Sequence, residues 1–514
     1  MVPGTKYHIL CNSPWYNREE NVPGTKAKGE RHMKLKDLMQ GIEILSASAD
    51  LELEIAHVRY DSRMVEAGDV FVAVSGYAVD GHRFIPSVME KGAAAVICER
   101  VPEGKVPYIQ VADSRRCLAS LGANFYDHPT KKMKMVAVTG TNGKTTTTYL
   151  LKAILEKARG AKVGLIGTNQ NMIGEQILPT ERTTPGPFEA QELFAKMYDA
   201  GCTHVVMETS SHALHQGRIH GVWYDVGIFT NLTQDHLDYH ETMEAYCDAK
   251  AILFRNCTTG VVNADDGWTE RLMKDAACSV LTYAKEAAAD LRAEEIELAS
   301  DHIAFTAVMG EQRVPIQVNI PGGFMVYNTL DVLGAALALG ISLEESAAVL
   351  SGVHHVKGRV EVVPTPGKDY TILIDYAHTS DSLINVLSTV KGFAKGRTVA
   401  LFGCGGDRDR TKRPLMGAAA AEYADFVVVT TDNPRTEKPA DIIADILPGL
   451  SGTKTPYVVV EDRIEAIHYC MDHAQPGDVI VLCGKGHETY QEIDHVKHHM
   501  DEREIVADYL KAGH

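Results

Sequence analysis

The chain has 514 residues, which is too long for one hydrophobic core and predicts about three domains of ~150 residues each. Its 45% of hydrophobic and 23% of charged residues are ordinary for a globular protein, and no apolar run approaches the ~20 residues of a membrane-spanning helix. The net charge of −17 excludes a general nucleic-acid binder, and ten scattered cysteines without a CxxC pair indicate reduced thiols in a cytoplasmic protein.

The first 32 residues differ from the rest of the chain. They are polar, and the pentapeptide VPGTK occurs in them twice, at residues 2–6 and 22–26. Two copies are too few for a repeat architecture, and the segment lacks the periodicity of a core-forming element. We therefore interpret residues 1–32 as a disordered extension, after which a periodic segment begins at Met33.

Residues 33–112 predict a small α/β domain. Its expected strands lie in VFVAVSG, AAVICER and PYIQVAD, and an expected helix lies in FIPSVMEKGA. A polar stretch that contains proline, YDHPTKKMK, precedes the next strong strand.

Residues 113–355 predict a larger α/β domain with a mostly parallel sheet. Its expected strands lie in MVAVTG, KVGLIGT, HVVMETSS, VGIFTNL and GVVNADD. Near-continuous Val/Ile runs of this kind are typical of strands that are covered on both faces. Residues 290–320 instead alternate between apolar and polar side chains, which predicts an antiparallel addition, and an Ala/Leu-rich helix over residues 328–340 follows.

Residues 356–514 repeat the α/β pattern and predict a third, Rossmann-like domain. Its expected strands lie in YTILIDYAH, TVALFGCGG, FVVVTTDNP, PYVVVED and DVIVLCGKGHE. In both large domains several strands run directly into Gly, Thr, Ser, Asp, Asn or His. Because ligands of open parallel sheets bind beyond the carboxyl ends of the strands, two such crevices facing each other could hold two substrates.

A phosphate-binding loop is expected between the strand MVAVTG and the helix TTTYLLKAILEKA. Its glycines let backbone N–H groups approach phosphates, and the helix N-terminus adds partial positive charge. Lys144 is expected to neutralise β- and γ-phosphate oxygens, and Thr145 to offer its hydroxyl to Mg²⁺. The loop departs from the usual G-x-x-x-x-G-K-[ST] pattern, because Val138 occupies the first glycine position. The expected loop residues are Gly140, Thr141, Asn142, Gly143, Lys144, Thr145 and Thr146.

This loop resembles the ATP loop of the Mur ligase superfamily, and the resemblance covers nearly the whole chain after Met33. The further matches are DSR, GDVFVAVSG, DGHRFI, TTP, METSSHAL, TNLTQDHLDYH, AKAILF, DYAHTSDSL, GCGGDRDRTKRP, TDNPRTEKP and CGKGHETYQ. The resemblance implies an N-terminal domain that binds the UDP portion of a substrate, a central P-loop-type ATPase domain and a C-terminal domain that binds an amino acid. It also implies ATP and Mg²⁺ as cofactors of an amide-forming reaction, in which ATP phosphorylates a carboxylate and an amine attacks the acyl phosphate.

The resemblance further implies a magnesium site in the central domain. Glu208 and His236 match family positions that bind Mg²⁺ near the γ-phosphate, although histidine is an unusual ligand for this ion. Asp235 and Asp238 flank His236 and are rival ligands. Lys250 matches a lysine whose carbamate helps to position a second Mg²⁺, whereas the helical segment AYCDAKAILF alone would indicate a surface lysine. The expected catalytic residues are Lys144, Glu208, His236 and Lys250, and the expected metal ligands are Thr145, Glu208, His236 and carbamylated Lys250.

Family positions that hold UDP-N-acetylmuramoyl-L-alanyl-D-glutamate are matched in two domains. Ser62 matches a contact to the uridine diphosphate, which residues 77–79 should also touch. The matches in the central domain are Thr183, Thr184, Ser210, Gln216 and Arg218, of which the arginine suits a carboxylate. Three further residues match nucleotide contacts: Asn328 to adenine, Arg359 to a phosphate and Asp375 to the ribose. By itself Asp375 would equally fit a turn or a helix cap.

The segment Asp432-Asn433-Pro434-Arg435 resembles the subgroup that adds meso-diaminopimelate. It follows the expected strand FVVVTT and should therefore face the crevice of the third domain. Meso-diaminopimelate differs from lysine by one carboxylate at its far end, which a planar guanidinium binds through two parallel hydrogen bonds. We expect lysine to leave Arg435 unpaired, which disfavours it. The remaining expected contacts to the amino acid are Arg408, Gly484 and Glu488, with Glu488 next to the distal ammonium.

Several alternatives stay open at this point. A lysine-adding version of the same ligase is the closest rival, and a ligase that adds D-Ala-D-Ala would lack TDNPRTEKP. A folylpolyglutamate synthase would share the ATP loop but not the N-terminal DSR module. A P-loop nucleotide switch, which is not an enzyme, would not need a second α/β domain with GCGGDRD and CGKGHE at strand ends. We expect a monomeric enzyme of peptidoglycan synthesis.

Overall fold

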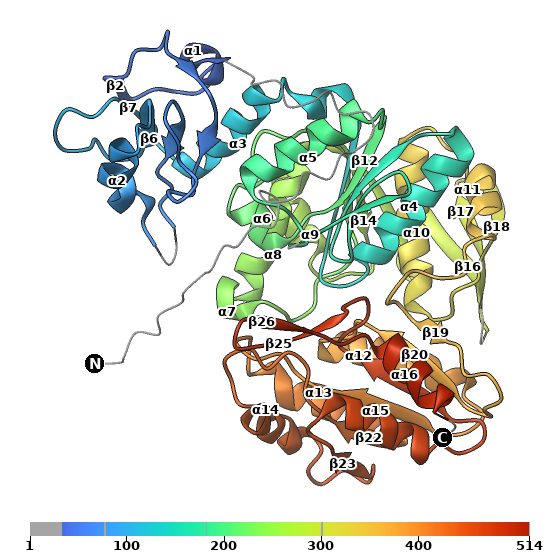
Figure 1. Ribbon diagram of the computed structural model, residues 1–514. Helices are drawn as coiled ribbons and strands as arrows, with labels where there is room; N and C mark the ends of the chain where they lie inside the picture. Colours follow the sequence, from blue (N-terminus) through green and yellow to red (C-terminus); the bar gives the residue numbers. More distant parts are fainter. Residues whose placement is uncertain (1–32, 77–78, 181, 300–301, 513–514) are drawn as a thin grey trace.

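The computed structural model describes residues 33–512, except residues 77–78, 181 and 300–301. The predicted extension with both VPGTK copies lies outside the described residues, as do Tyr77 and Ala78 of the predicted substrate loop. Three α/β units follow one another along the chain, each around its own sheet (Figure 1). Among the described helices, none is both long enough and apolar enough to cross a bilayer.

The N-terminal unit is built on a five-stranded sheet in the order β2-β7-β6-β5-β4. Strands β4 to β7 pair in parallel, and β2 is added antiparallel to β7. Helix α3 packs its apolar face into this core through Leu118, Leu121 and Phe125, so the core reaches beyond residue 112, where we expected the domain to end. The elements are β1 Met33–Lys34, α1 Leu35–Leu38, β2 Ser46–Ala47, β3 Glu54–Ile55, β4 Val58–Arg59, β5 Val70–Val72, α2 Ile85–Glu90, β6 Ala95–Cys98, β7 Tyr108–Gln110 and α3 Ser114–Phe125.

The central unit contains an eleven-stranded sheet in the order β11-β10-β9-β12-β8-β13-β14-β15-β16-β17-β18. Strands β9 to β16 of this order pair in parallel, as the Val/Ile runs predict. The antiparallel addition predicted for residues 290–320 is confirmed by β16, β17 and β18. The strands are β8 Lys134–Thr139, β9 Val163–Ile166, β10 Asn171–Ile173, β11 Gln176–Leu178, β12 His204–Glu208, β13 Tyr224–Phe229, β14 Cys257–Asn263, β15 Ser279–Ala284, β16 Leu291–Leu298, β17 Ile303–Met309 and β18 Gln312–Val318.

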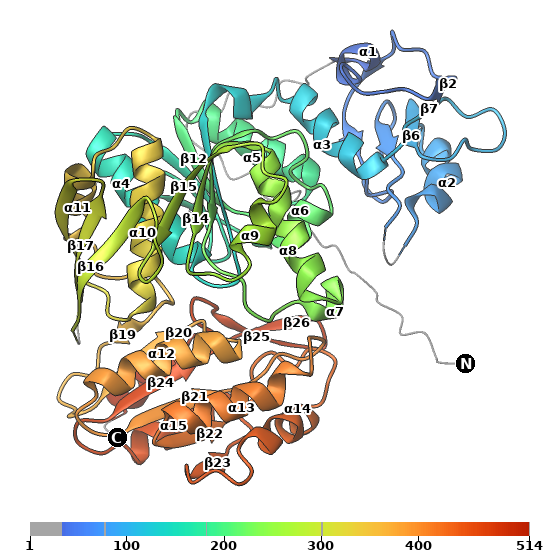
Figure 2. The same cartoon turned by 180° about the vertical axis from the view of Figure 1, so that it is seen from behind.

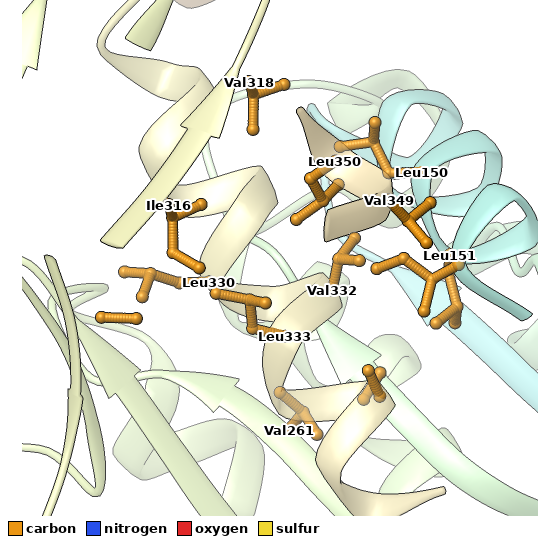
Figure 3. Packing of buried hydrophobic residues seen from close by; sticks show 14 of the residues in the cluster. Leu150, Leu151, Val261, Ile316, Val318, Leu330, Val332, Leu333, Val349 and Leu350 are labelled. Carbon is orange, nitrogen blue, oxygen red and sulfur yellow. The ribbon is translucent and has the colours of Figure 1, made fainter. Parts of the chain in front are cut away.

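Helices cover both faces of the central sheet. On one face α4, α10 and α11 bury Leu150, Leu333 and Leu350 against the strands (Figure 3). On the other face α5 and α8 bury Phe194 and Tyr246. Helix α10 is apolar almost all round, which is typical of a helix without a solvent face. The helices are α4 Lys144–Arg159, α5 Pro187–Asp199, α6 Ser211–His215, α7 Leu237–His240, α8 Met243–Ala251, α9 Thr269–Met273, α10 Phe324–Ala338 and α11 Leu343–Leu350.

The C-terminal unit is a doubly wound, Rossmann-like domain around a six-stranded sheet in the order β19-β20-β24-β21-β22-β23. Helices α12, α13 and α14 cover one face, and α15 and α16 cover the other. The strands are β19 Glu361–Val363, β20 Thr371–Asp375, β21 Thr398–Phe402, β22 Phe426–Val429, β23 Tyr457–Val459, β24 Val479–Cys483 and a separate hairpin of β25 Tyr490–Ile493 and β26 Val496–His499. The helices are α12 Ser380–Phe393, α13 Lys412–Tyr423, α14 Pro439–Ile446, α15 Arg463–Asp472 and α16 Glu502–Lys511.

The central and C-terminal units lie against each other, as both views show (Figures 1 and 2). Asn142 Nδ2 donates to Asp381 Oδ2 at 2.7 Å, which joins the loop before α4 to the start of α12. Asn169 Nδ2 donates to the carbonyl oxygen of Lys357 at 2.7 Å, so the central unit also holds the segment that leads into β19. These contacts place the loop after β8 at the interface of the two units.

Candidate active site

The predicted phosphate loop lies between β8 and α4 and is closely packed by its neighbours. Gly140 and Gly143 have φ angles of 146° and 89°, which side chains other than glycine rarely adopt. A Cβ atom on Gly140 would lie 1.9 Å from Thr230 Oγ1, and one on Gly143 would lie 2.4 Å from Asn328 Oδ1. Both glycines are therefore required by space as well as by backbone conformation. Asn328, on α10, touches the loop itself.

Three cationic side chains converge on this loop. Lys144 Nζ donates to the carbonyl oxygens of Gly140 and Thr141, at 2.9 and 2.8 Å. Lys250 Nζ donates to the same Gly140 oxygen at 2.9 Å. Arg359, from the C-terminal unit, donates through Nη2 to Thr145 Oγ1 at 3.0 Å, while its buried Nε has no hydrogen-bond partner among the described residues. Clustered cations at a helix N-terminus favour a bound anion such as a triphosphate.

Burial affects the pKa values of the two lysines. It lowers the pKa of Lys144, and the charge of Arg359 adds to this shift. It also lowers the pKa of Lys250 well below its ordinary value, with a further contribution from Lys144. Lys250 is 1% exposed and lies 4.4 Å from the centre of the Tyr246 ring. It is therefore not the surface lysine that its helical segment alone would indicate.

Oxygen atoms suited to Mg²⁺ lie beside the loop. Thr145 Oγ1 donates to Glu208 Oε1 at 2.8 Å, and Thr168 donates to both carboxylate oxygens of Glu208, from its backbone N at 3.0 Å and from its hydroxyl at 2.8 Å. Hydroxyl and carboxylate oxygens are the donors that Mg²⁺ prefers, so these residues fit the ion. Within the described residues, no group of three or more His, Cys, Asp or Glu side chains has metal-binding geometry.

His236 and its rival ligand Asp235 form a pair of their own. His236 caps α7 with a φ of 56°, and its Nε2 lies 3.4 Å from Asp235 Oδ2. Burial in this pair lowers the pKa of His236, which favours the neutral ring that can act as a ligand. Asp235 is buried and also lies 3.8 Å from Lys412 Nζ of the C-terminal unit. The other rival, Asp238, follows on α7.

The residues predicted to hold the muramoyl peptide form one cluster after β12. Thr184 Oγ1 donates to the carbonyl oxygen of Glu208 at 3.0 Å and accepts from the backbone N of Ser210 at 3.0 Å. Arg218 donates to the Thr184 carbonyl oxygen at 3.1 Å and, through two nitrogens, to Gln216 Oε1. Burial lowers the pKa of Arg218 to about 10, helped by neighbouring arginines. Thr183 joins the cluster through Thr168, with 3.0 Å between the two hydroxyl oxygens.

Two further predicted contacts lie apart from these clusters. Ser62 lies in the N-terminal unit, where its carbonyl oxygen accepts from Lys91 Nζ at 2.8 Å, and no hydrogen bond of the described residues joins it to the other site residues. Asp375, at the end of β20, accepts backbone N–H groups of Val360 and Ala377 at 2.8 Å each. This carboxylate already holds a turn, so a ribose would have to share it.

The predicted amino-acid contacts meet at the ends of β22 and β24. Asn433 Nδ2 donates to Glu488 Oε2 at 2.9 Å, and a Cβ atom on Gly484 would lie 2.5 Å from Asp432 Oδ2. Burial opposes ionisation of Asp432, but Lys485 and Arg463 hold its pKa below the ordinary value. Burial raises the pKa of Glu488, against the opposing charge of Lys485.

Arg435 is already paired, contrary to the expectation that it depends on a substrate for a partner. Its Nε donates to Glu492 Oε2 at 3.1 Å and its Nη1 donates to the carbonyl oxygen of Gly406 at 2.9 Å. Pro434 precedes it, and the φ of Arg435 is 51°. Arg408 is exposed nearby, and its Nη1 donates to the carbonyl oxygen of Asp407 at 3.0 Å.

Family models match most of the chain. The Mur ligase middle domain matches residues 138–336, the Mur ligase glutamate ligase domain matches residues 358–486, and the Mur ligase family catalytic domain matches residues 54–126. A relative from Clostridium acetobutylicum, named UDP-N-acetylmuramoyl-L-alanyl-D-glutamate–2,6-diaminopimelate ligase 1, is 45% identical over 93% of this chain and 99% of its own length. The chain belongs to the Mur ligase family.

Other relatives and solved structures resemble this Mur ligase over similar lengths. A Bacillus cereus protein named as a 2,6-diaminopimelate ligase is 44% identical over 93% of this chain and 98% of its own. A solved structure of a ligase with the same name has a TM-score of 0.67 and 32% identity, over 94% of this chain and 99% of that one. The folylpolyglutamate synthase of Mycobacterium tuberculosis, at 16% identity and a TM-score of 0.59 over 73% of this chain and 93% of that one, shares the fold alone.

Some site residues of this Mur ligase did not stand out in the sequence. Lys485 is fully buried and donates to Asn433 Oδ1 at 2.5 Å and to Glu488 Oε2 at 3.1 Å. Thr168 holds Glu208, and Glu492 holds Arg435. Lys485 and Thr168 follow the ends of β24 and β9, so attention to every polar residue at a strand end would have found them.

Proposed function

We propose that this Mur ligase joins meso-2,6-diaminopimelate to the D-glutamate of UDP-N-acetylmuramoyl-L-alanyl-D-glutamate and consumes ATP. The observation that carries the proposal is the cluster after β22 and β24, where Arg435 lies beside the Asn433 and Glu488 pair. A guanidinium and a carboxylate side by side suit the zwitterionic far end of diaminopimelate, whereas lysine offers only an ammonium there. The relatives named as diaminopimelate ligases support the same substrate.

The phosphate loop and its cations would bind and orient the triphosphate. Lys144 and Arg359 would face the developing negative charge as the γ-phosphoryl group passes to the substrate carboxylate. Arg218 would hold a carboxylate of the muramoyl peptide, since it already lies beside Thr184. The acyl phosphate then gives up phosphate when the free amine of diaminopimelate attacks its carbonyl carbon.

Mg²⁺ would be held by Thr145, Glu208, His236 and a carbamate on Lys250. When bound, the ion neutralises phosphate oxygens during the transfer. A carbamate forms when a neutral amine attacks CO₂ and loses a proton, and the lowered pKa of Lys250 supplies that neutral amine.

The proposed substrates can be tested by ADP release. The purified protein is mixed with ATP, Mg²⁺, the UDP-muramoyl dipeptide and one amino acid at a time, including meso-diaminopimelate and lysine. We expect kcat/KM for diaminopimelate to exceed that for lysine by about a hundredfold, because the loss of one charge-assisted hydrogen bond costs up to about 3 kcal/mol. Arg435→Ala should remove most of this preference.

Arg410→Ala serves as the matched control, because Arg410 is an exposed arginine that pairs with Asp445 on the same unit. It should keep the preference unchanged. Efficient use of lysine by the unmutated protein would refute the diaminopimelate assignment and leave the ligase assignment standing. ADP release that does not depend on the muramoyl dipeptide would refute the ligase assignment itself.

A further inference from the structure

The hairpin β25–β26 is attached to the backbone of Arg435. The backbone N of Arg435 donates to the carbonyl oxygen of Glu492 at 3.0 Å, and the backbone N of Asp494 donates to the carbonyl oxygen of Arg435 at 2.9 Å. The φ of 51° at Arg435 is uncommon for a residue with a side chain, so these two bonds stabilise a conformation that the chain would not favour alone.

The side chain of Glu492 also helps to fix the orientation of the Arg435 guanidinium. Its Oε2 accepts from Nε at 3.1 Å, and the Gly406 carbonyl oxygen accepts from Nη1 at 2.9 Å. No acceptor among the described residues bonds Nη2. The pair is only partly exposed, at 18% for Arg435 and 21% for Glu492. Nε and one hydrogen of Nη1 are thus occupied, while the hydrogens of Nη2 have no acceptor among the described residues and can bind a carboxylate.

The backbone of Glu492 also fixes the neighbouring amide. Its N–H donates to Asn433 Oδ1 at 2.9 Å, and Lys485 Nζ donates to the same oxygen at 2.5 Å. With its oxygen held by two donors, Asn433 must turn its Nδ2 toward Glu488, where the distance is 2.9 Å. Glu492 therefore holds both Arg435 and Asn433, the two side chains that would face the far end of diaminopimelate in the proposed function.

We infer that Glu492 is a positioning residue for recognition of the distal carboxylate, because it holds Nε of Arg435 and leaves Nη2 for the substrate. The inference rests on the proposed function. A guanidinium offers five N–H donors in a fixed plane, so a protein carboxylate on Nε and a substrate carboxylate on Nη2 can bind at once. Discrimination against lysine then comes from a bond that lysine cannot make, since Arg435 keeps Glu492 as a partner with either amino acid.

Three variants of Glu492 distinguish the effect of the position of its acceptor oxygen from the effect of its negative charge. Glu492→Ala removes the acceptor, Glu492→Asp keeps the charge but withdraws it by one methylene, and Glu492→Gln keeps an acceptor oxygen at the same place without the charge. KM and kcat are measured for meso-diaminopimelate and for 2-aminopimelate, which keeps the distal carboxylate and lacks the distal ammonium. Glu504→Ala is the control, because Glu504 forms an exposed pair with His499 at the same end of the unit.

We expect Glu492→Ala and Glu492→Asp to raise KM for both amino acids by the same factor of about ten, since one charge-assisted hydrogen bond is misplaced. The value of kcat should change less than about twofold, because Glu492 does not touch the reacting atoms. Glu492→Gln should restore KM to within about threefold of the unmutated value, and Glu504→Ala should leave both constants unchanged. Thermal unfolding of each variant checks that the fold is intact.

An unchanged KM in both Glu492→Ala and Glu492→Asp would overturn the inference. So would a rise confined to meso-diaminopimelate, because it would make Glu492 a contact to the distal ammonium, and so would a loss of kcat alone. If the unmutated protein uses lysine and not diaminopimelate, the proposed function fails, and this inference fails with it. If the unmutated protein uses diaminopimelate and KM is unchanged in the Glu492 variants, only the inference fails.

Discussion

Lys250 lies on α8 with its amine buried between the Gly140 carbonyl oxygen and the Tyr246 ring. Because burial lowers the pKa of this amine well below its ordinary value, the neutral form that reacts with CO₂ is favoured, and the carbamate would bring a negative charge to the two remaining cations at the loop, Lys144 and Arg359. We expect Lys250→Ala to lower kcat by about a hundredfold or more, since it removes a metal-positioning group. Added short carboxylates should restore part of the activity.

The control for Lys250→Ala is Lys274→Ala, at an exposed lysine of the same unit, which should keep full activity. Isotope-labelled bicarbonate should also give a carbamate carbon signal in the unmutated protein and none in Lys250→Ala. Full activity of Lys250→Ala would show that the lysine only packs against the loop.

At this scale the sequence predicts the identity of many site residues but not their partners. The strand ends and motifs indicate Glu208, Arg218 and the loop, because the chemistry of each residue type is visible in the sequence. Burial of Lys250 depends on how α8 packs on the sheet, and the partner of Arg435 comes from a hairpin 57 residues further along the chain. Such long-range contacts are set by the tertiary fold, so local pattern cannot supply them.

Helix α10 carries a carboxyl group in its most buried part. Asp331 is 0% exposed, and both of its oxygens lie 3.0–3.1 Å from Thr147 Oγ1 on α4. Burial raises its pKa well above the ordinary value, although the bonds from Thr147 and the backbone oppose the shift. The pair joins α10, which carries Asn328, to the helix that follows the phosphate loop.

The raised pKa of Asp331 predicts the direction in which the stability of the protein changes with pH. Because the raised pKa lets the folded carboxyl keep its proton to a higher pH than the unfolded one, which ionises above about pH 4, folding takes up a proton in this range and stability is lost as pH rises through the folded pKa. Asp331→Asn binds no proton in either state. We expect its free energy of unfolding to fall less than that of the unmutated protein between pH 4.5 and 7. Denaturant unfolding of the central unit measures this, and equal losses would mean that Asp331 is ionised in the fold.

The elements themselves were largely predictable, because buried parallel strands leave Val/Ile runs in the sequence. All the strands expected in the two large units are present, from β8 to β14 and from β20 to β24. Strand β26 was not expected, since its sequence VKHH is exposed throughout and carries no apolar pattern. The helix expected at residue 328 begins at Phe324, because the apolar residues before Asn328 belong to the same buried face.

The proposed nucleotide site is divided between two units of the molecule. The loop, Lys144 and Thr145 belong to the central unit, while Arg359 and Asp381 reach it from the C-terminal unit. The chain between these units is short, running from the end of α11 at Leu350 to the start of β19 at Glu361. Asn169 holds the middle of this segment through the carbonyl oxygen of Lys357.

With the proposed site, we expect ATP to act as a bivalent ligand for two tethered half-sites, and the tether then sets the effective concentration of the second half. A longer, flexible tether lowers that concentration roughly as the −3/2 power of its length, without altering a contact in either half. Glycine–serine insertions after Gly352, an exposed position, should weaken ATP binding progressively in titration calorimetry. The same insertions within the exposed turn at Gly310 should leave ATP binding unchanged. If the affinity for ATP does not depend on the length of the tether, the central half alone holds the nucleotide.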